Sequence, residues 1–293
     1  MRRAWEPDSG NTKQGRVRAF LKSILALASF ANLMTGGCLM AQSVSVKNVV
    51  LVHGAFADGS SWSKVIPLLQ AKGYHVTSVA IPLTSFAEDV AATKRAIAAE
   101  DGPVILVGHS YGGVVITEAG NDPKVAGLVY VAAFAPDANQ NITEISKPFP
   151  PPPGLNMVKP LTDGFILLTP EGIETAFAQD LSKEEKALML AVQPQTAGAI
   201  FGAKPTAAAW HEKPTWYIVS SNDRMIAPEQ EKSMAKQMNA TTTVLPSSHV
   251  AMLSHPTEVA NVIEDAATGK KESGIILTFG RPAVEFRCGP QRR

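Results

Sequence analysis

The stretch that decides the fold reads Val104-Ile105-Leu106-Val107-Gly108-His109-Ser110-Tyr111-Gly112-Gly113. Its four apolar residues predict a buried strand, and residues 114–119 predict the continuation of a helix that starts near Ser110. A serine between two glycines on such a strand-to-helix turn is held at the carboxyl end of a sheet, where it can react. We therefore predict that Ser110 is a nucleophile and not merely a helix cap.

The residues on either side of this turn repeat the same alternation of strand and helix. From Asn48 to Ala267 the chain places short apolar runs between helical patterns, which is typical of βαβ units and a parallel sheet. The expected strands cover residues 49–52, 76–81, 104–107, 125–133, 215–220 and 241–245. The sequence thus predicts an α/β fold, a mostly parallel sheet flanked by helices, in one domain over residues 48–267.

The alternation breaks between about residues 136 and 210. This segment begins with a proline-rich stretch, Pro148 to Gly154, which is stiff and unlike a βα unit. Two short helices are expected after it, near 171–180 and at 183–192, the second with a Ser182 and Glu185 capping box. We interpret the segment as a helical cap inserted over the sheet.

A serine nucleophile needs a base and an acid, which follow it in the order acid and then histidine in this type of fold. Asp223 follows the strand at 215–220, and His249 follows the strand at 241–245. We predict these two residues as the acid and the base. The competing acids are Asp137, Asp163 and Asp180, and the main competing base is His255; His53, His75, His109 and His211 are expected to be structural.

The reaction also needs donors for a developing oxyanion, and backbone N–H groups usually supply them. One is expected from Tyr111, the residue after the nucleophile. The other is expected from the loop after the first strand, His53-Gly54-Ala55-Phe56, whose small residues allow close backbone approach. Either Ala55 or Phe56 can supply it, and we favour Phe56.

Over residues 49–267 the chain resembles the α/β-hydrolase superfamily. The Leu-Val-His-Gly-Ala loop at 51–55 and the Gly-His-Ser-Tyr-Gly-Gly turn are similar to the branch of plant methyl-ester esterases and hydroxynitrile lyases, and to its bacterial members. The resemblance implies a Ser110, Asp223 and His249 triad, a helical cap, and neither metal nor organic cofactor. Hydroxynitrile lyases of this branch usually carry Thr in place of Gly54 and Lys in place of Val250.

These observations predict a serine-dependent carboxylic ester hydrolase that forms an acyl-enzyme on a small, largely apolar ester. The alternatives are a hydroxynitrile-lyase-like carbon–carbon lyase and a receptor-like binding protein with slow turnover on the same fold. From the cap, we expect Phe165, Phe177 and Phe201 to line an apolar substrate pocket, with Met189 as a further candidate.

The amino-acid composition bears on possible partners, disulfides and metal sites. The chain has 293 residues, 45% of them hydrophobic and 18% charged, and a net charge of +1, which gives no electrostatic sign of a nucleic-acid partner. Two cysteines exclude a disulfide scaffold and a cysteine-rich zinc site. Nothing in the sequence fixes an oligomeric state.

The two ends are predicted to lie outside the fold. Residues 1–41 are expected to form a signal peptide or a disordered leader, because a basic stretch precedes the apolar run 23–34 and small Ala41 follows it. That run is shorter than the roughly 20 residues that span a bilayer, so no stable membrane span is expected. A true signal peptide predicts a periplasmic or secreted protein, and otherwise a cytoplasmic one. Residues 268–293 are expected to be a tail.

Overall fold

The structure, a computed structural model, describes residues 46–271. The predicted leader at 1–41 and nearly all of the predicted tail at 268–293 lie outside these residues. The interpretation of the leader as an export signal therefore stays a prediction.

A six-stranded parallel sheet forms the centre of the described chain, with strand order β2-β1-β3-β4-β8-β9. Buried, mostly β-branched strands such as β1 and β3 occupy its middle, as expected where helices cover both faces. The α/β fold class predicted from the sequence is confirmed. The strands are β1 (Asn48–Val52), β2 (His75–Val79), β3 (Val104–His109), β4 (Val125–Val131), β8 (Thr215–Ser220) and β9 (Thr241–Leu245).

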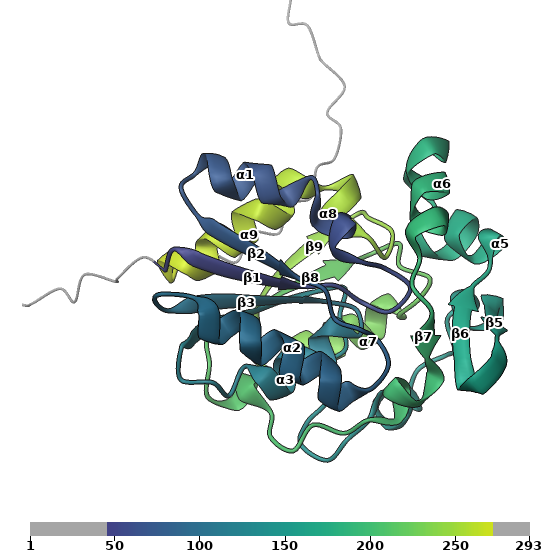
Figure 1. The fold of residues 1–293 in the computed structure, drawn as a ribbon, viewed down its shortest axis with the longest axis horizontal. Helices are drawn as coiled ribbons and strands as arrows, with labels where there is room; N and C mark the ends of the chain where they lie inside the picture. The colour runs from purple at the N-terminus through teal and green to yellow at the C-terminus, as the bar shows by residue number, and fades with distance from the viewer. Residues whose placement is uncertain (1–45, 272–293) are drawn as a thin grey trace, which may run out of the picture. The chain divides into compact units, whose positions relative to one another are not determined.

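Helices cover both faces of the sheet (Figure 1). On one face α1 (Val65–Ala71) packs against α9 (Pro256–Thr268), and on the other α2 (Phe86–Ala99) packs against α3 (Gly112–Ala119). Two more helices complete the described core: α7 (Pro228–Gln237) packs against β8, and the short α8 (Ala251–Ser254) packs against α9. This arrangement leaves the loops at the carboxyl ends of the strands free to form a site.

The segment predicted as an insertion lies beside the sheet, at the side of Figure 1 that carries α5 and α6. Its two ends meet, because the Trp210 indole N–H donates to the Pro136 carbonyl oxygen at 3.1 Å. Its helices are α4 (Ile142–Ser146), α5 (Pro170–Gly172), which continues into a π turn at Ile173–Phe177, and α6 (Lys183–Val192). The capping box of α6 is present, with both Ser182 and Glu185 making the expected bonds.

In addition to the helices expected from the sequence, the segment holds a small antiparallel sheet of order β5-β6-β7. Its strands are β5 (Val158–Pro160), β6 (Phe165–Leu168) and β7 (Thr196–Ala197). Strands of two to four residues are too short to show an alternating pattern, so nothing in the sequence periodicity announces them.

Candidate active site

Ser110 lies on the turn between β3 and α3, at the carboxyl edge of the sheet. Its backbone has φ of 52°, a left-handed conformation that is uncommon for a residue with a side chain. The turn is held on both sides, since Ser110 N–H donates to Val131 O at 3.3 Å and Phe134 N–H donates to Ser110 O at 3.1 Å. The left-handed conformation of Ser110 is therefore held by hydrogen bonds to the end of β4 and to the residues that follow it.

Glycines make this turn possible through close backbone contact. A Cβ atom on Gly108 would lie 2.6 Å from the Gly112 carbonyl oxygen, and one on Gly112 would lie 2.7 Å from the His53 carbonyl oxygen. At Gly113 the added atom would lie only 2.3 Å from the Phe134 carbonyl oxygen. Any side chain at these positions would push the serine out of place.

Asp223 and His249 meet at the same edge of the sheet. His249 Nδ1 donates to Asp223 Oδ2 at 2.6 Å, and both residues are buried. The other carboxylate oxygen, Oδ1, accepts the N–H groups of Met225 at 2.6 Å and Ile226 at 3.0 Å. Because Nδ1 is engaged, Nε2 of the imidazole is the nitrogen left to act as a base.

Two of the competing acids, and the competing histidine, have other partners. Asp137 pairs with His211 Nε2 at 2.9 Å, and Asp180 accepts the N–H of Ser248 at 2.7 Å. Asp163 lies in an exposed turn of the cap. The His255 ring contacts Ser254 Oγ at 3.0 Å. Of these acids, the structure brings only Asp223 into contact with the His249 ring.

The candidate oxyanion donors differ in whether their backbone N–H groups have protein partners. Within residues 46–271, neither Tyr111 N–H nor Ala55 N–H donates to another protein group, although both residues are buried. Phe56 N–H, in contrast, donates to the buried Thr196 hydroxyl of β7 at 3.4 Å. Since buried donors are normally satisfied, the geometry favours Ala55 over Phe56 as the second oxyanion donor.

Ser110 and His249 line one apolar cavity with a volume of about 280 Å³. Two of the predicted pocket residues, Phe177 and Phe201, line it as well, and the edge of the Phe177 ring packs against His249 with ring centres 5.0 Å apart. Phe165 does not line this cavity. Neighbouring side chains of a strand point to opposite faces, and on β6 it is Ile166 that faces the serine.

The sequence profile of the alpha/beta hydrolase family matches residues 49–262. The chain belongs to the alpha/beta hydrolase family. The match runs from β1 into α9 and includes the turn at Ser110 and the loops of Asp223 and His249.

Individual relatives are esterases and hydrolases. The chain is 27% identical over 273 residues to a pyrethroid hydrolase of Sphingobium wenxiniae, covering 82% of this chain and 94% of the relative. It is 29% identical to methylesterase 8 of Arabidopsis thaliana, over 40% of this chain and 49% of that protein. The crystal structure of a pyrethroid hydrolase from Sphingobium faniae superposes with a TM-score of 0.65 at 25% identity, covering 76% of this chain and 97% of that one.

Two further buried residues support the hydrolase site: Asp89, which belongs to no motif in the sequence, and His109, which lies in the serine turn. The buried carboxylate of Asp89 accepts the Tyr111 hydroxyl and the Leu83 N–H, both at 2.8 Å, and so anchors the residue next to the nucleophile. His109 Nε2 donates to the His249 carbonyl oxygen at 2.9 Å. Burial, together with the nearby His249, holds the pKa of His109 well below its usual range, so this ring is neutral and holds the His249 loop.

A second buried acid, Glu231 of α7, lies behind Asp223. Its Oε2 accepts the Ser220 N–H at 2.9 Å, and its Oε1 has no hydrogen-bond partner in the described part of the chain. Burial, and next the negative charge of Asp223, raise the pKa of Glu231 well above its usual range. No motif marks Glu231, because it lies in a helix with several other charged residues.

Residues 46–271 contain neither a metal-binding cluster nor a helix that could cross a membrane. No three His, Cys, Asp or Glu side chains there are grouped so that they could hold a metal ion. None of the helices in that range combines the length and the apolar character that crossing a membrane requires. The prediction that the enzyme needs neither metal nor cofactor stays a prediction.

Proposed function

We propose that the protein is a serine-dependent carboxylic ester hydrolase that acts on a small, largely apolar ester through an acyl-enzyme. The observation that carries the proposal is a single apolar cavity lined by both Ser110 and His249, with Asp223 bonded to the far side of the imidazole. The relatives named as pyrethroid hydrolase and methylesterase act on the same class of bond and support it.

The proposed reaction has two halves. His249 Nε2 takes the hydroxyl proton while Ser110 Oγ attacks the ester carbonyl, and the resulting oxyanion is stabilised by the N–H groups of Tyr111 and Ala55. Collapse breaks the bond to the alcohol, which leaves with the proton from His249. Water then attacks the acyl-enzyme, gives its proton to His249, and releases the acid as Ser110 regains its proton.

Two features weigh against a carbon–carbon lyase. A Cβ atom at Gly54 would lie 2.7 Å from Ser110 Cβ and 3.0 Å from the His109 ring, so a threonine there would collide with the nucleophile. Val250, where such lyases carry a lysine, is buried and apolar. The site thus lacks polar side chains that could bind a cyanohydrin at these two positions. A binding protein with slow turnover is separated from an enzyme by the assay below.

The test is hydrolysis of short p-nitrophenyl esters by the wild-type protein and by Ser110→Ala. We expect wild-type turnover, and a loss of about 10³-fold or more in kcat for the variant with an unchanged thermal midpoint. His249→Ala should be comparably damaging, and His255→Ala should be nearly neutral. Turnover by Ser110→Ala close to that of the wild type would reject the proposal.

A further inference from the structure

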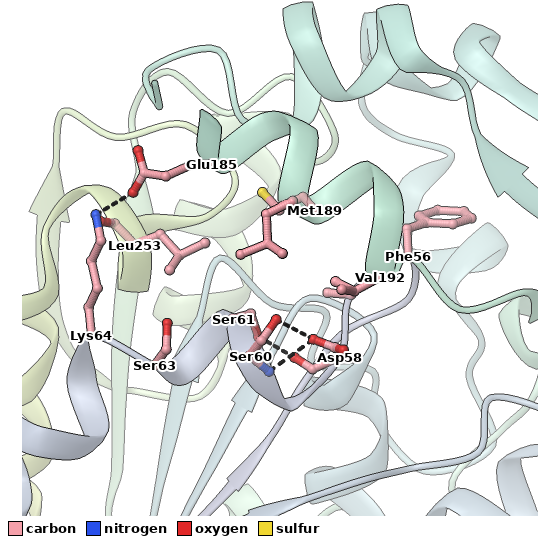
Figure 2. Close-up of a pocket in the computed structure, with 12 residues that line it drawn as sticks. Phe56, Asp58, Ser60, Ser61, Ser63, Lys64, Glu185, Met189, Val192 and Leu253 are labelled. Atoms are coloured by element: carbon pink, nitrogen blue, oxygen red, sulfur yellow. Dashed lines mark hydrogen bonds and ion pairs between the residues drawn. The ribbon is translucent and has the colours of Figure 1, made fainter. Parts of the chain in front are cut away.

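Two glutamates of the protein differ in how their charge is balanced. Glu185 of α6 lines the cavity beneath that helix, and its carboxylate pairs with Lys64 at 2.5 Å (Figure 2). The hydrogen bond from Lys64 is the main reason why the pKa of Glu185 lies below its usual range, and this acid is ionised. Glu231 of α7 is instead fully buried and forms no ion pair with any residue in the described part of the chain. A buried anion without a cation is costly, and such an acid keeps its proton.

The polar groups next to Glu231 supply one hydrogen bond to it. Its Oε2 accepts the Ser220 N–H at 2.9 Å, and its Oε1 receives no donor from the described residues. The nearby Tyr217 hydroxyl donates its own proton to the Ala133 carbonyl oxygen at 2.5 Å. Burial, and next the charge of Glu231, raise the pKa of Tyr217 well above its usual range, so this hydroxyl stays neutral. Oε1 is therefore the atom that carries the proton of Glu231.

Asp223 is the group that can accept this proton. After burial, the charge of Asp223 and a hydrogen bond between the two acids contribute most to the raised pKa of Glu231. Lys232, whose exposed ammonium group pairs with Glu229 at 3.2 Å, has a smaller effect in the opposite direction. Two carboxyl groups form a hydrogen bond only when one of them holds a proton, so one member of this pair is the donor.

The other partners of Asp223 decide which acid holds the proton. A carboxylate has about four acceptor positions, and three of those on Asp223 are occupied. Oδ1 accepts the N–H groups of Met225 and Ile226, and Oδ2 accepts His249 Nδ1–H. Three donors stabilise the negative charge on Asp223, whereas Glu231 has one. The charge therefore lies on Asp223, and its last acceptor position is open to the Glu231 hydroxyl.

We propose that Glu231 is a positioning residue of the hydrolase site, which donates its Oε1 hydroxyl to Asp223 and so holds the carboxylate that orients His249. The inference rests on the proposed ester hydrolysis and adds a residue that acts through Asp223 without touching the substrate. Ser220 ties the same acid to the turn of Asp223, because the Asp223 N–H donates to the Ser220 carbonyl oxygen at 3.1 Å. The hydroxyl also limits how strongly Asp223 attracts the proton of the imidazole.

Two substitutions separate this role from packing. In Glu231→Gln the amide oxygen can accept the Ser220 N–H while the amide nitrogen donates to Asp223. Glu231→Met has a side chain of similar length with neither group. The matched control is Glu229→Met, at an exposed position of the same helix. The measurements are kcat/KM of the full chain for one p-nitrophenyl ester between pH 5 and pH 8, and the thermal midpoint.

We expect Glu231→Gln to match the wild type both in its maximal kcat/KM and in the pH at which kcat/KM reaches half of that maximum. Glu231→Met should lower kcat/KM about tenfold, because a hydrogen bond to a charged acceptor is lost. It should also move the half-maximal pH upward, since Asp223 with one donor fewer attracts the imidazole proton more strongly. Glu229→Met should change neither quantity.

Two results would overturn the inference. A half-maximal pH that falls in Glu231→Gln would show that wild-type Glu231 is ionised, because the substitution would then remove a negative charge from behind the imidazole. A Glu231→Met variant that loses thermal stability but keeps the wild-type pH profile would show that Glu231 only fills space.

Infrared spectroscopy keeps the inference testable if Glu231→Met does not fold. The difference spectrum between wild type and Glu231→Gln at pH 7 should contain the band of a protonated carboxyl group, and its absence would also overturn the inference. Ester turnover that is lost in Ser110→Ala would leave the proposed function standing in each of these cases. Absence of turnover with every ester would instead refute the proposed function itself.

Discussion

The strand edge that carries Ser110, Asp223 and His249 differs sharply from the cap that faces it. The edge is built from fully buried strands and from glycines whose hydrogen atoms cannot be replaced without collision. The cap consists of short helices and strands, and it leaves apolar side chains such as Leu155 and Leu188 more than half exposed, at 53% and 58%. The first region tolerates little change in geometry, and the second tolerates much.

The two regions suit different tasks: the edge holds the reactive groups, and the cap selects the shape of the substrate. Groups that must be held to within a fraction of an ångström are placed on rigid elements, where packing and hydrogen bonds fix them. Groups that only select the shape of a substrate lie on the looser layer. Substitutions should accordingly affect stability at the edge and selectivity in the cap.

The largest expected effect is on the free energy of unfolding. It should differ between alanine substitutions at two glycines, one in each region. Gly113→Ala would place a Cβ atom 2.3 Å from the Phe134 carbonyl oxygen, whereas Gly202 of the cap has no neighbouring atom within 4 Å. We expect Gly113→Ala to lower the free energy of unfolding by about 1–3 kcal/mol. Gly202→Ala should leave it unchanged or raise it by about 0.4–1 kcal/mol. Urea denaturation measures both; equal effects would remove the contrast.

Buried Glu231 predicts that the stability of the protein depends on pH. Because the pKa of Glu231 is raised in the folded state, folding retains a proton that the unfolded chain releases above a pKa of about 4.3. The stability of the wild type should therefore fall as pH rises above that value, by at most about 1.4 kcal/mol per pH unit from this residue. Glu231→Gln keeps an acceptor for the Ser220 N–H. Because glutamine does not titrate, the variant should not lose this part of its stability as pH rises.

The measurement is the difference in thermal midpoint between Glu231→Gln and wild type at several values between pH 5 and pH 8. We expect the difference to grow in favour of the variant as pH rises. Glu229→Gln, an exposed position on the same helix, is the control and should show no such trend. A constant difference for Glu231→Gln would mean that the buried acid is ionised throughout.

The smallest expected effect is on the selectivity between short and long acyl esters. It should differ between two aromatic residues of the cap. Phe165 and Phe201 are both half-buried, but only Phe201 lines the cavity of Ser110. Phe201→Ala should change the ratio of kcat/KM between a short and a long acyl ester several-fold, and Phe165→Ala should leave that ratio unchanged. Equal ratios in both variants would show that the cavity wall does not select substrates.

The same two regions differ in how far sequence could predict them. Buried strands such as β1 and β3 were recognisable because they are continuous apolar runs, and the boundaries predicted for β8 and β9, at 215–220 and 241–245, match the structure. The Ser110 turn is a local motif, since its glycines and serine are consecutive. Asp223 and His249 could be selected because a loop after a parallel strand always reaches the same edge of the sheet.

The strands of the cap and the buried acids that support the site could not be predicted in this way. The strands β5, β6 and β7 are two to four residues long, too short to show an alternating pattern, so the sequence could not indicate whether Phe165 or Ile166 lines the cavity. Asp89 and Glu231 act through tertiary contacts with residues 22 and 11 positions away, at Tyr111 and Ser220. The preference for Ala55 over Phe56 as a donor depends on Thr196, which is 140 residues distant from Phe56.

Covalent labelling can show whether Ser110 is the nucleophile. The full chain is treated with a fluorophosphonate, digested and analysed by mass spectrometry, alongside residual esterase activity. We expect one adduct, on the peptide that contains Ser110, formed in step with loss of activity and absent from Ser110→Ala. His249→Ala should label far more slowly, since its serine has no base. Loss of activity with Ser110 unmodified, or full activity with Ser110 labelled, would show that Ser110 is not the nucleophile.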